Sequence, residues 1–178
     1  MTDLAQRLLD ESYLEGDFIL SSGRRSKFYL DKYLFETAPD LLRDLAQALV
    51  AKLPAYEPFD LLAGPELGAV PLVAAMSLAS GKRFVIVRKE EKGYGTRRLL
   101  EGRFARGQSV VAVEDVVTSG GQAVAAIRRL GEAGLEVKGL LCVVDREQGG
   151  ADLLTAEGIG LDPLFTAGQL GIKVGIEG

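Results

Sequence analysis

Two adjacent carboxylates, Glu114 and Asp115, end an apolar run that begins at Ser109. Small hydroxyl residues and glycines follow over residues 118–122, and a helix-like apolar pattern comes next. Free N–H groups at a helix start favour an anion such as phosphate, and glycines let the backbone approach it closely. The carboxylates cannot hold that anion, because like charges repel; they would accept hydrogen bonds from sugar hydroxyls or attract a cation. The segment therefore predicts a site for a phosphorylated sugar.

The purely structural alternative is that the acids only end a strand and that Thr118 and Ser119 cap a helix.

Residue types that are absent from the sequence exclude several kinds of catalytic and metal site. The sequence contains no histidine and a single cysteine, Cys142, which excludes disulfide frameworks, Cys/His zinc sites and catalytic triads that need an imidazole base. Cys142 lies in an apolar run, which favours a small buried side chain over a reactive thiol.

Two familiar phosphate motifs are missing. The sequence has no GxxxxGK[ST], and no GxGxxG opens a helix after a strand. The sequence therefore lacks the main evidence for a nucleoside-triphosphate hydrolase or a dinucleotide oxidoreductase.

A cationic segment lies in an otherwise acidic chain. The net charge is −4, whereas residues 88–106 carry an excess of cations. This contrast favours a compact anionic ligand over nucleic acid, although a solvated surface loop is the simpler alternative. The interval from residue 88 to 108 has no clear helix or strand pattern and is too long for a passive connection, so it predicts a lid or binding loop.

Apolar periodicity predicts the elements that must position these residues. A helix is expected around Leu4 to Leu9, short strands near residues 18–20 and 28–30, and a helix from Pro39 to about residue 52. Further along, predicted strands near 60–63, 83–87, 109–114, 137–144 and 161–165 alternate with predicted helices near 67–79, 120–133 and 150–157. This alternation predicts an α/β fold with a doubly wound, mostly parallel sheet and flanking helices.

The length of 178 residues, with 47% apolar and 26% charged residues, suits one globular domain. We expect a single domain over residues 1–178, with a small N-terminal hood in about 1–36 and a mobile lid in about 89–103. No apolar run approaches the roughly 20 residues that cross a bilayer, and the first residues lack a secretory signal pattern. We therefore expect a cytoplasmic protein with neither membrane nor nucleic-acid partners.

The acid-pair segment resembles the hallmark of the type I phosphoribosyltransferases, which is an apolar strand, two acids, two apolar residues, Thr and a Gly-rich loop. Residues Glu114-Asp115-Val116-Val117-Thr118-Ser119-Gly120-Gly121 match it at every position. Four further segments are similar, in order, to the orotate-using branch of that family: Ser21 to Tyr29, Gly64 to Pro71, Arg88 to Gly95 and Val144 to Arg146.

The resemblance implies transfer of a phosphoribosyl group from 5-phosphoribosyl 1-diphosphate to orotate, which gives orotidine 5′-monophosphate and diphosphate. It implies Mg²⁺ as cofactor, held mainly by the diphosphate and by no protein ligand directly, and a homodimer in which the lid reaches the neighbouring subunit's site. The alternatives are a purine-base phosphoribosyltransferase and a non-catalytic regulator that senses 5-phosphoribosyl 1-diphosphate. A plain scaffold protein stays open as well, because fold alone does not prove function.

The resemblance also implies residue roles. Lys92, Glu114 and Asp115 are expected to be catalytic, and Thr118 and Arg146 to bind orotate. The diphosphate loop is expected at Gly64, Pro65, Glu66 and Leu67. The residues expected to bind 5-phosphoribosyl 1-diphosphate are Arg88, Lys89, Lys92, Tyr94, Glu114, Asp115, Val116, Val117, Thr118, Ser119, Gly120, Gly121 and Gln122.

Three positions depart from the family pattern. Tyr94 stands where relatives usually have His, and Leu67 and Ser21 stand where many have Lys. A mechanism that relies on a titrating histidine therefore fails for this chain. The lost positive charge could be replaced by other hood cations, namely Arg24, Arg25, Lys27 and Lys32, although these are equally consistent with exposed solubilising residues.

Overall fold

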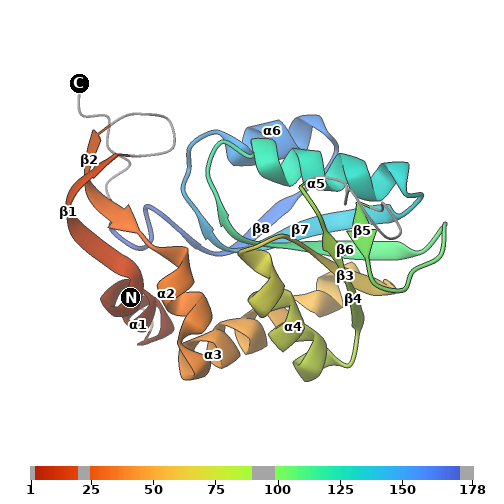
Figure 1. The fold of residues 1–178 in the computed structure, drawn as a ribbon, viewed down its shortest axis with the longest axis horizontal. Coiled ribbons are helices and arrows are strands. Elements are labelled where there is room, and N and C mark those ends of the chain that lie inside the picture. Colours follow the sequence, from red (N-terminus) through yellow and green to blue (C-terminus); the bar gives the residue numbers. More distant parts are fainter. Residues whose placement is uncertain (1–2, 20–24, 90–98, 173–178) are drawn as a thin grey trace.

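The structure is a computed structural model that describes residues 3–19, 25–89 and 99–172. Its main body is a six-stranded sheet in the order β5-β4-β3-β6-β7-β8 (Figure 1). The strands are β3 (Leu61–Pro65), β4 (Arg83–Val87), β5 (Leu100–Glu101), β6 (Ser109–Val117), β7 (Glu136–Asp145) and β8 (Leu161–Thr166). Neighbouring strands are parallel except β5, which runs antiparallel to β4. The predicted mostly parallel sheet is confirmed.

Helices cover both faces of the sheet (Figure 1). One face carries α3 (Pro39–Val50), the 3₁₀ turn η1 (Leu53–Tyr56) and α4 (Ala69–Ser80), and the other carries α5 (Gly121–Glu132) and α6 (Gly150–Ala156). Each layer has its own apolar core against the sheet. The doubly wound arrangement is therefore confirmed.

The central strand β6 contributes side chains to both cores. Val113 packs in the core with α3 and α4, whereas its neighbour Ala112 packs in the core with α5 and α6. Successive side chains of a strand point to opposite faces of a sheet. The same alternation directs the adjacent acids Glu114 and Asp115 to different sides at the end of the strand.

The hood consists of α1 (Asp3–Ser12), β1 (Tyr13–Ile19), β2 (Arg25–Leu30) and α2 (Lys32–Thr37). The strands β1 and β2 form a separate antiparallel pair and extend further than the short strands expected from sequence. Helix α2 was not predicted, because six residues are too few to show an apolar period. Its N-terminus is fixed by Asp31, whose side chain accepts a hydrogen bond from the Tyr33 backbone N–H.

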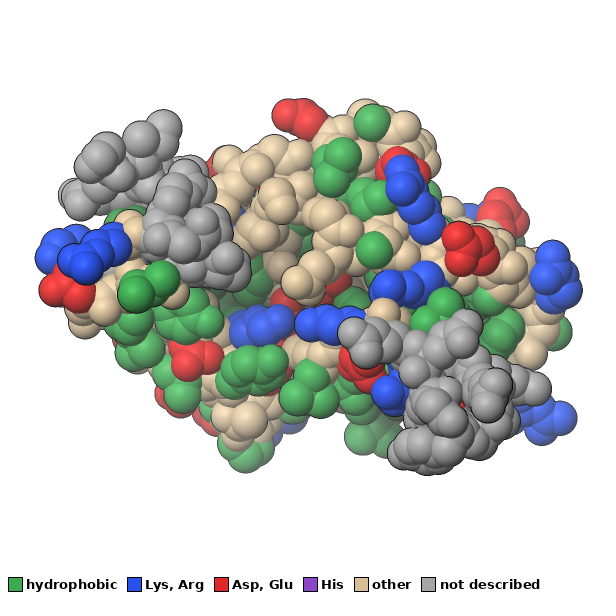
Figure 2. All heavy atoms as spheres, turned by 45° about the horizontal axis from the view of Figure 1, so that its top comes forward, with side chains coloured by type: hydrophobic (Ala, Val, Ile, Leu, Met, Phe, Trp, Pro, Cys, Tyr) green, Lys and Arg blue, Asp and Glu red, His purple; other side chains and the backbone are tan. Residues whose placement is uncertain are grey.

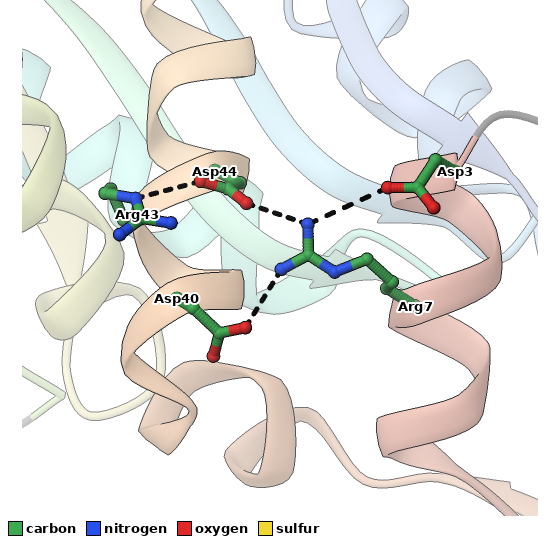
Figure 3. Close-up of polar contacts among 5 residues, drawn as sticks. All are labelled: Asp3, Arg7, Asp40, Arg43 and Asp44. Atoms are coloured by element: carbon green, nitrogen blue, oxygen red, sulfur yellow. Dashed lines mark hydrogen bonds and ion pairs between the residues drawn. The ribbon is translucent and has the colours of Figure 1, made fainter.

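A cluster of ion pairs joins the hood to the main body (Figure 3). Arg7 of α1 lies 3.1 Å from Asp40 and 2.8 Å from Asp44, both on α3. The hydrogen bond from Arg7 lowers the pKa of Asp44 and raises the pKa of Arg7. Exposed pairs of this kind contribute little to stability, so the hood is held mainly by burial of Leu8 and Phe35, which have no exposed surface.

The interval from residue 88 to 108 contains one element that sequence did not indicate. Leu100 and Glu101 form β5, which pairs with the last residues of β4 and makes the edge of the sheet. Two residues are too few for a strand signal, and only the pairing partner defines them. Residues 90–98, which hold most of the predicted lid, lie outside the described residues. Within the described ranges, no helix is long and apolar enough to cross a membrane.

Candidate active site

A cavity of about 590 Å³ opens where β6 ends. Figure 2 shows a hollow on this face, with Lys and Arg side chains around it and acidic side chains within it. Ligands of open α/β sheets bind beyond the carboxyl ends of the strands, where this cavity lies. Its lining residues are Phe18, Ile19, Tyr29, Leu30, Lys32, Glu114, Asp115, Val116, Val117, Thr118, Ser119, Gly120, Gly121, Gln122, Ala123, Arg146 and Gln148.

The turn between β6 and α5 forms one wall of the cavity. Gly120 precedes the helix with a φ of +81°, a conformation that residues with a side chain rarely adopt. A Cβ at Gly120 would lie 2.9 Å from the Cα of Gly150, at the start of α6. The turn therefore needs glycine for its backbone angle and for its close packing. Sequence reasoning missed Gly150, for which the pair of glycines at 149 and 150 was the available signal.

The acid pair is buried at the base of the cavity. Glu114 is 7% exposed and Asp115 is 2% exposed. Burial, followed by the charge of Asp115, raises the pKa of Glu114 to about 8. Lys32 of α2 supplies the compensating charge, because its Nζ lies 2.7 Å from the Oδ2 atom of Asp115. Burial is the largest single effect and would lower the pKa of Lys32, but the charge and hydrogen bond of Asp115, together with the charges of Glu36 and Glu114, raise it overall.

Gly68 makes room for this ion pair. A Cβ at Gly68 would lie 1.7 Å from the Oδ2 atom of Asp115 and 2.6 Å from the Nζ atom of Lys32. Of the hood cations that could replace the missing lysine charge, Lys32 lines the cavity, whereas Lys27 pairs with Asp17. The structure thus places a cation at the acid pair from an element that sequence did not predict.

Glu36 is a further acidic residue at this place that sequence reasoning missed. It lies on α2 and is 3% exposed. Its carboxyl group lies close enough to Asp115 for the two to influence each other's protonation. No sequence signal could have found it, because the helix that carries it was itself not predicted.

The predicted diphosphate loop lies against the base of the predicted lid. An oxygen of Glu66 accepts a hydrogen bond from the Lys89 backbone N–H at 2.8 Å, and the other oxygen lies 3.4 Å from an Arg88 nitrogen. Arg129 of α5 donates to the Lys89 carbonyl at 2.9 Å. Leu67 is 65% exposed at the tip of the loop. These contacts bring together the predicted site residues Glu66, Arg88 and Lys89, which do not themselves line the cavity.

The remaining residues that the sequence analysis singled out are found in different places. Lys92, Tyr94 and Ser21 lie outside the described residues. Arg146 follows β7 and lines the cavity, and its Nε atom is buried without a hydrogen-bond partner among the described residues. Burial lowers the pKa of Arg146. Cys142 has no exposed surface, and burial raises the pKa of its thiol, which confirms the prediction of an inert buried cysteine.

The fold and the acid-pair turn agree with a comparison of the sequence against known families. A sequence model described as "Phosphoribosyl transferase domain" matches residues 36–155. This match covers more than half of the chain and includes the acid pair, the turn and Arg146. The chain therefore belongs to the phosphoribosyltransferase family, as the sequence resemblance implied.

Comparison with individual relatives shows which branch of the family this chain resembles. The orotate phosphoribosyltransferase of Methanocella arvoryzae is 45% identical over 95% of this chain and 96% of its own. The crystal structure of the Aeropyrum pernix orotate phosphoribosyltransferase has a TM-score of 0.85 and 32% identity, over 98% of this chain and 99% of that one. A Mycobacterium tuberculosis orotate phosphoribosyltransferase in complex with 5-phospho-alpha-D-ribosyl 1-diphosphate has a TM-score of 0.79 and 30% identity, over 95% and 97%. Within the family, the chain groups with the orotate phosphoribosyltransferases.

The contact between Gly120 and Gly150 gives a testable prediction about the turn. Gly120→Ala should lower the free energy of unfolding by about 1–3 kcal/mol, because it combines an unfavourable φ with a backbone clash. Gly121→Ala is the matched control, since a Cβ there has no described atom within 4 Å and its φ is not positive. Urea unfolding followed by circular dichroism measures both. Equal stability of the two variants would contradict the assigned packing.

Proposed function

We propose that the protein transfers the 5-phosphoribosyl group from 5-phosphoribosyl 1-diphosphate to orotate, which gives orotidine 5′-monophosphate and diphosphate. The observation that carries the proposal is a single cavity that brings together a helix-start turn, a buried acid pair and the cation Arg146. The names of the relatives support orotate as the acceptor. The complex of the Mycobacterium tuberculosis relative supports the phosphoribosyl donor.

The turn and the acid pair bind different parts of the sugar phosphate. Backbone N–H groups and hydroxyls of residues 118–122 bind the 5′-phosphate, because they present donors at the positive end of α5. Glu114 and Asp115 accept hydrogen bonds from the ribose hydroxyls. Loss of diphosphate leaves a sugar with cationic character, which the nearby Asp115 carboxylate stabilises without a covalent nucleophile. A chain without histidine can perform this reaction.

Cations bind the leaving group in the proposed complex. Arg88 and Lys89, set against the loop of Gly64 to Leu67 by Glu66, contact the diphosphate oxygens, and Lys92 and Tyr94 add donors from the lid. Mg²⁺ enters with the diphosphate as part of the substrate. Within the described ranges no group of three or more His, Cys, Asp or Glu is arranged to hold a metal ion. In the proposed complex the diphosphate oxygens supply most of the ligands.

Arg146 selects the acceptor. Its guanidinium lines the cavity with a buried Nε atom that has no protein partner among the described residues. A partly buried cation of this kind is stabilised by an anionic ligand, and a guanidinium fork fits a planar carboxylate. Thr118 lines the same cavity and adds a hydroxyl. A neutral purine would leave the positive charge uncompensated, which favours orotate.

We also propose a homodimer, as the family resemblance implies. An apolar groove of about 380 Å³ lies between α3 and α4. Leu78, on its rim, is 89% exposed, more than any other large apolar residue in the described part of the chain. Such a surface is typical of an interface, and a second copy of the chain would cover it.

The reaction itself is tested by the loss of orotate absorbance in the presence of 5-phosphoribosyl 1-diphosphate and Mg²⁺. We expect turnover with orotate, loss of turnover when EDTA removes Mg²⁺, and recovery when Mg²⁺ is restored. Hypoxanthine and adenine are assayed in parallel. Consumption of a purine in place of orotate would favour a purine phosphoribosyltransferase, and binding without any turnover would favour a sensor.

Replacement of Arg146 tests the acceptor site. Arg146→Gln removes the charge that faces the cavity, so the KM for orotate should rise by about tenfold or more, whereas the KM for 5-phosphoribosyl 1-diphosphate should change by less than about threefold. Arg128→Gln is the matched control, because Arg128 is exposed and pairs with Glu157 on the surface. An unchanged KM for orotate in Arg146→Gln would remove this residue from acceptor binding.

The dimer interface is tested by placing a charge in the groove. Leu78→Asp should convert the dimer to a monomer at micromolar concentration, because an ionised carboxylate is costly to bury at an interface. Leu153→Asp on α6 is the control, since Leu153 is 40% exposed on the opposite face of the sheet. Sedimentation equilibrium distinguishes the two states. A wild-type protein that is monomeric would contradict the dimer, and a dimeric Leu78→Asp would move the interface elsewhere.

A further inference from the structure

Glu36 is a buried carboxyl that the reaction outlined above does not use. It lies four residues after Lys32 on α2, so both side chains leave the same face of the helix. Asp31 caps this helix by accepting from the Tyr33 N–H at 3.0 Å, and Phe35, which has no exposed surface, anchors the helix in the core. The helix therefore presents Lys32 and Glu36 together to the end of β6.

Burial makes Glu36 a costly residue to keep. It is 3% exposed, and its Oε1 atom finds no hydrogen-bond partner in the part of the chain that the structure describes. A buried polar atom without a partner lowers stability unless another contact offsets the cost. The carboxyl group of Glu36 faces Asp115, one helix turn after Lys32, whose Nζ atom lies 2.7 Å from the Oδ2 atom of the same Asp115. A costly group whose contact is a carboxylate of the candidate site points to a role in that site.

The charges around Glu36 determine its protonation state. The titratable groups that face it are Asp115 and Glu114 from β6 and Lys32 from its own helix. An ionised Glu36 would add another carboxylate around this one ammonium. Burial, followed by the hydrogen bond and the charge of Asp115, raises the pKa of Glu36 to about 9. At neutral pH the side chain is therefore uncharged, and its O–H can donate to a carboxylate.

We propose that Glu36 is a positioning residue: as a neutral acid it donates a hydrogen bond to Asp115 and, with Lys32, fixes the carboxylate that receives the ribose. This inference rests on the proposed function, because it concerns the contact of Asp115 with the sugar. Lys32 supplies charge and Glu36 supplies a donor, so Asp115 is held from two sides. A carboxylate accepts several hydrogen bonds, which leaves capacity for the ribose hydroxyls.

Steady-state kinetics of two Glu36 variants test this role. Glu36→Gln keeps a donor of similar shape, whereas Glu36→Leu removes it. Glu36→Gln should keep the KM for 5-phosphoribosyl 1-diphosphate within about twofold of wild type, and Glu36→Leu should raise it by about tenfold or more with a smaller change in kcat. The matched changes Glu11→Gln and Glu11→Leu, at an exposed position of α1, should leave both parameters unchanged.

The pH profile adds a signature that a purely structural residue would not give. The wild-type KM should rise as the pH approaches the pKa of Glu36, because ionisation removes the donor, and Glu36→Gln should lack that rise. A wild-type KM in Glu36→Leu would overturn the proposal. So would a Glu36→Gln variant as defective as Glu36→Leu, because it would show that the charge of Glu36 is needed rather than its proton.

Stability measurements test the neutral state without any substrate. The pKa of Glu36 in the folded chain, about 9, lies above the ordinary value of 4.5. The stability linked to Glu36 is therefore full below the ordinary pKa and is lost as the pH rises toward the folded value, whereas glutamine does not titrate. Glu36→Gln should gain melting temperature over wild type from about pH 5 to about pH 8, and Glu11→Gln should not.

The two experiments fail in different ways. A difference in melting temperature that does not change with pH would overturn the neutral Glu36, whatever the reaction. Absence of orotate turnover in the wild type would contradict the proposed function, and the positioning role with it, while the stability result would still stand for the protonation state.

Discussion

The ion pair between Lys32 and Asp115 is the contact on which the candidate site depends. It joins residues 83 positions apart in the sequence and connects the hood to the central strand. Asp115 is 2% exposed, so its carboxylate has lost most of its hydration and relies on the ammonium 2.7 Å away. Gly68 leaves the space that this pair occupies. The hood, Gly68 and β6 therefore meet at one buried ion pair, and the position of each constrains the others.

This contact lets one cavity present hydrogen-bond donors and acceptors close together. The turn after β6 presents backbone donors to an anion, whereas the acids before it present acceptors to hydroxyls. The strand's alternation separates the two acids, since Asp115 meets Lys32 and Glu36 from the hood, and Glu114 is influenced also by the charge of Lys89. Arg146 brings a positive charge from the neighbouring strand β7. In the proposed complex, each ligand group therefore contacts a different strand end or helix start.

Local patterns made the central part of the site predictable. The apolar run, the acid pair and the glycines are contiguous, and they form β6, the turn and the start of α5, as the sequence indicated. Glu36, Gly68 and Gly150 could not be predicted, because each matters through a contact with a distant segment. Helix α2 and strand β5 are too short to show a period, and tertiary packing defines them. Sequence therefore identified the residues that line the cavity better than those that hold them in place.

A crystal structure of the protein with orotidine 5′-monophosphate tests the central claim most directly. The account predicts the 5′-phosphate within about 3.2 Å of backbone N–H groups in residues 118–122. It also predicts ribose hydroxyls on Asp115, whose contact with Lys32 persists, and the pyrimidine carboxylate beside Arg146. A nucleotide bound elsewhere, with those N–H groups free of phosphate and Asp115 away from the ribose, would contradict it.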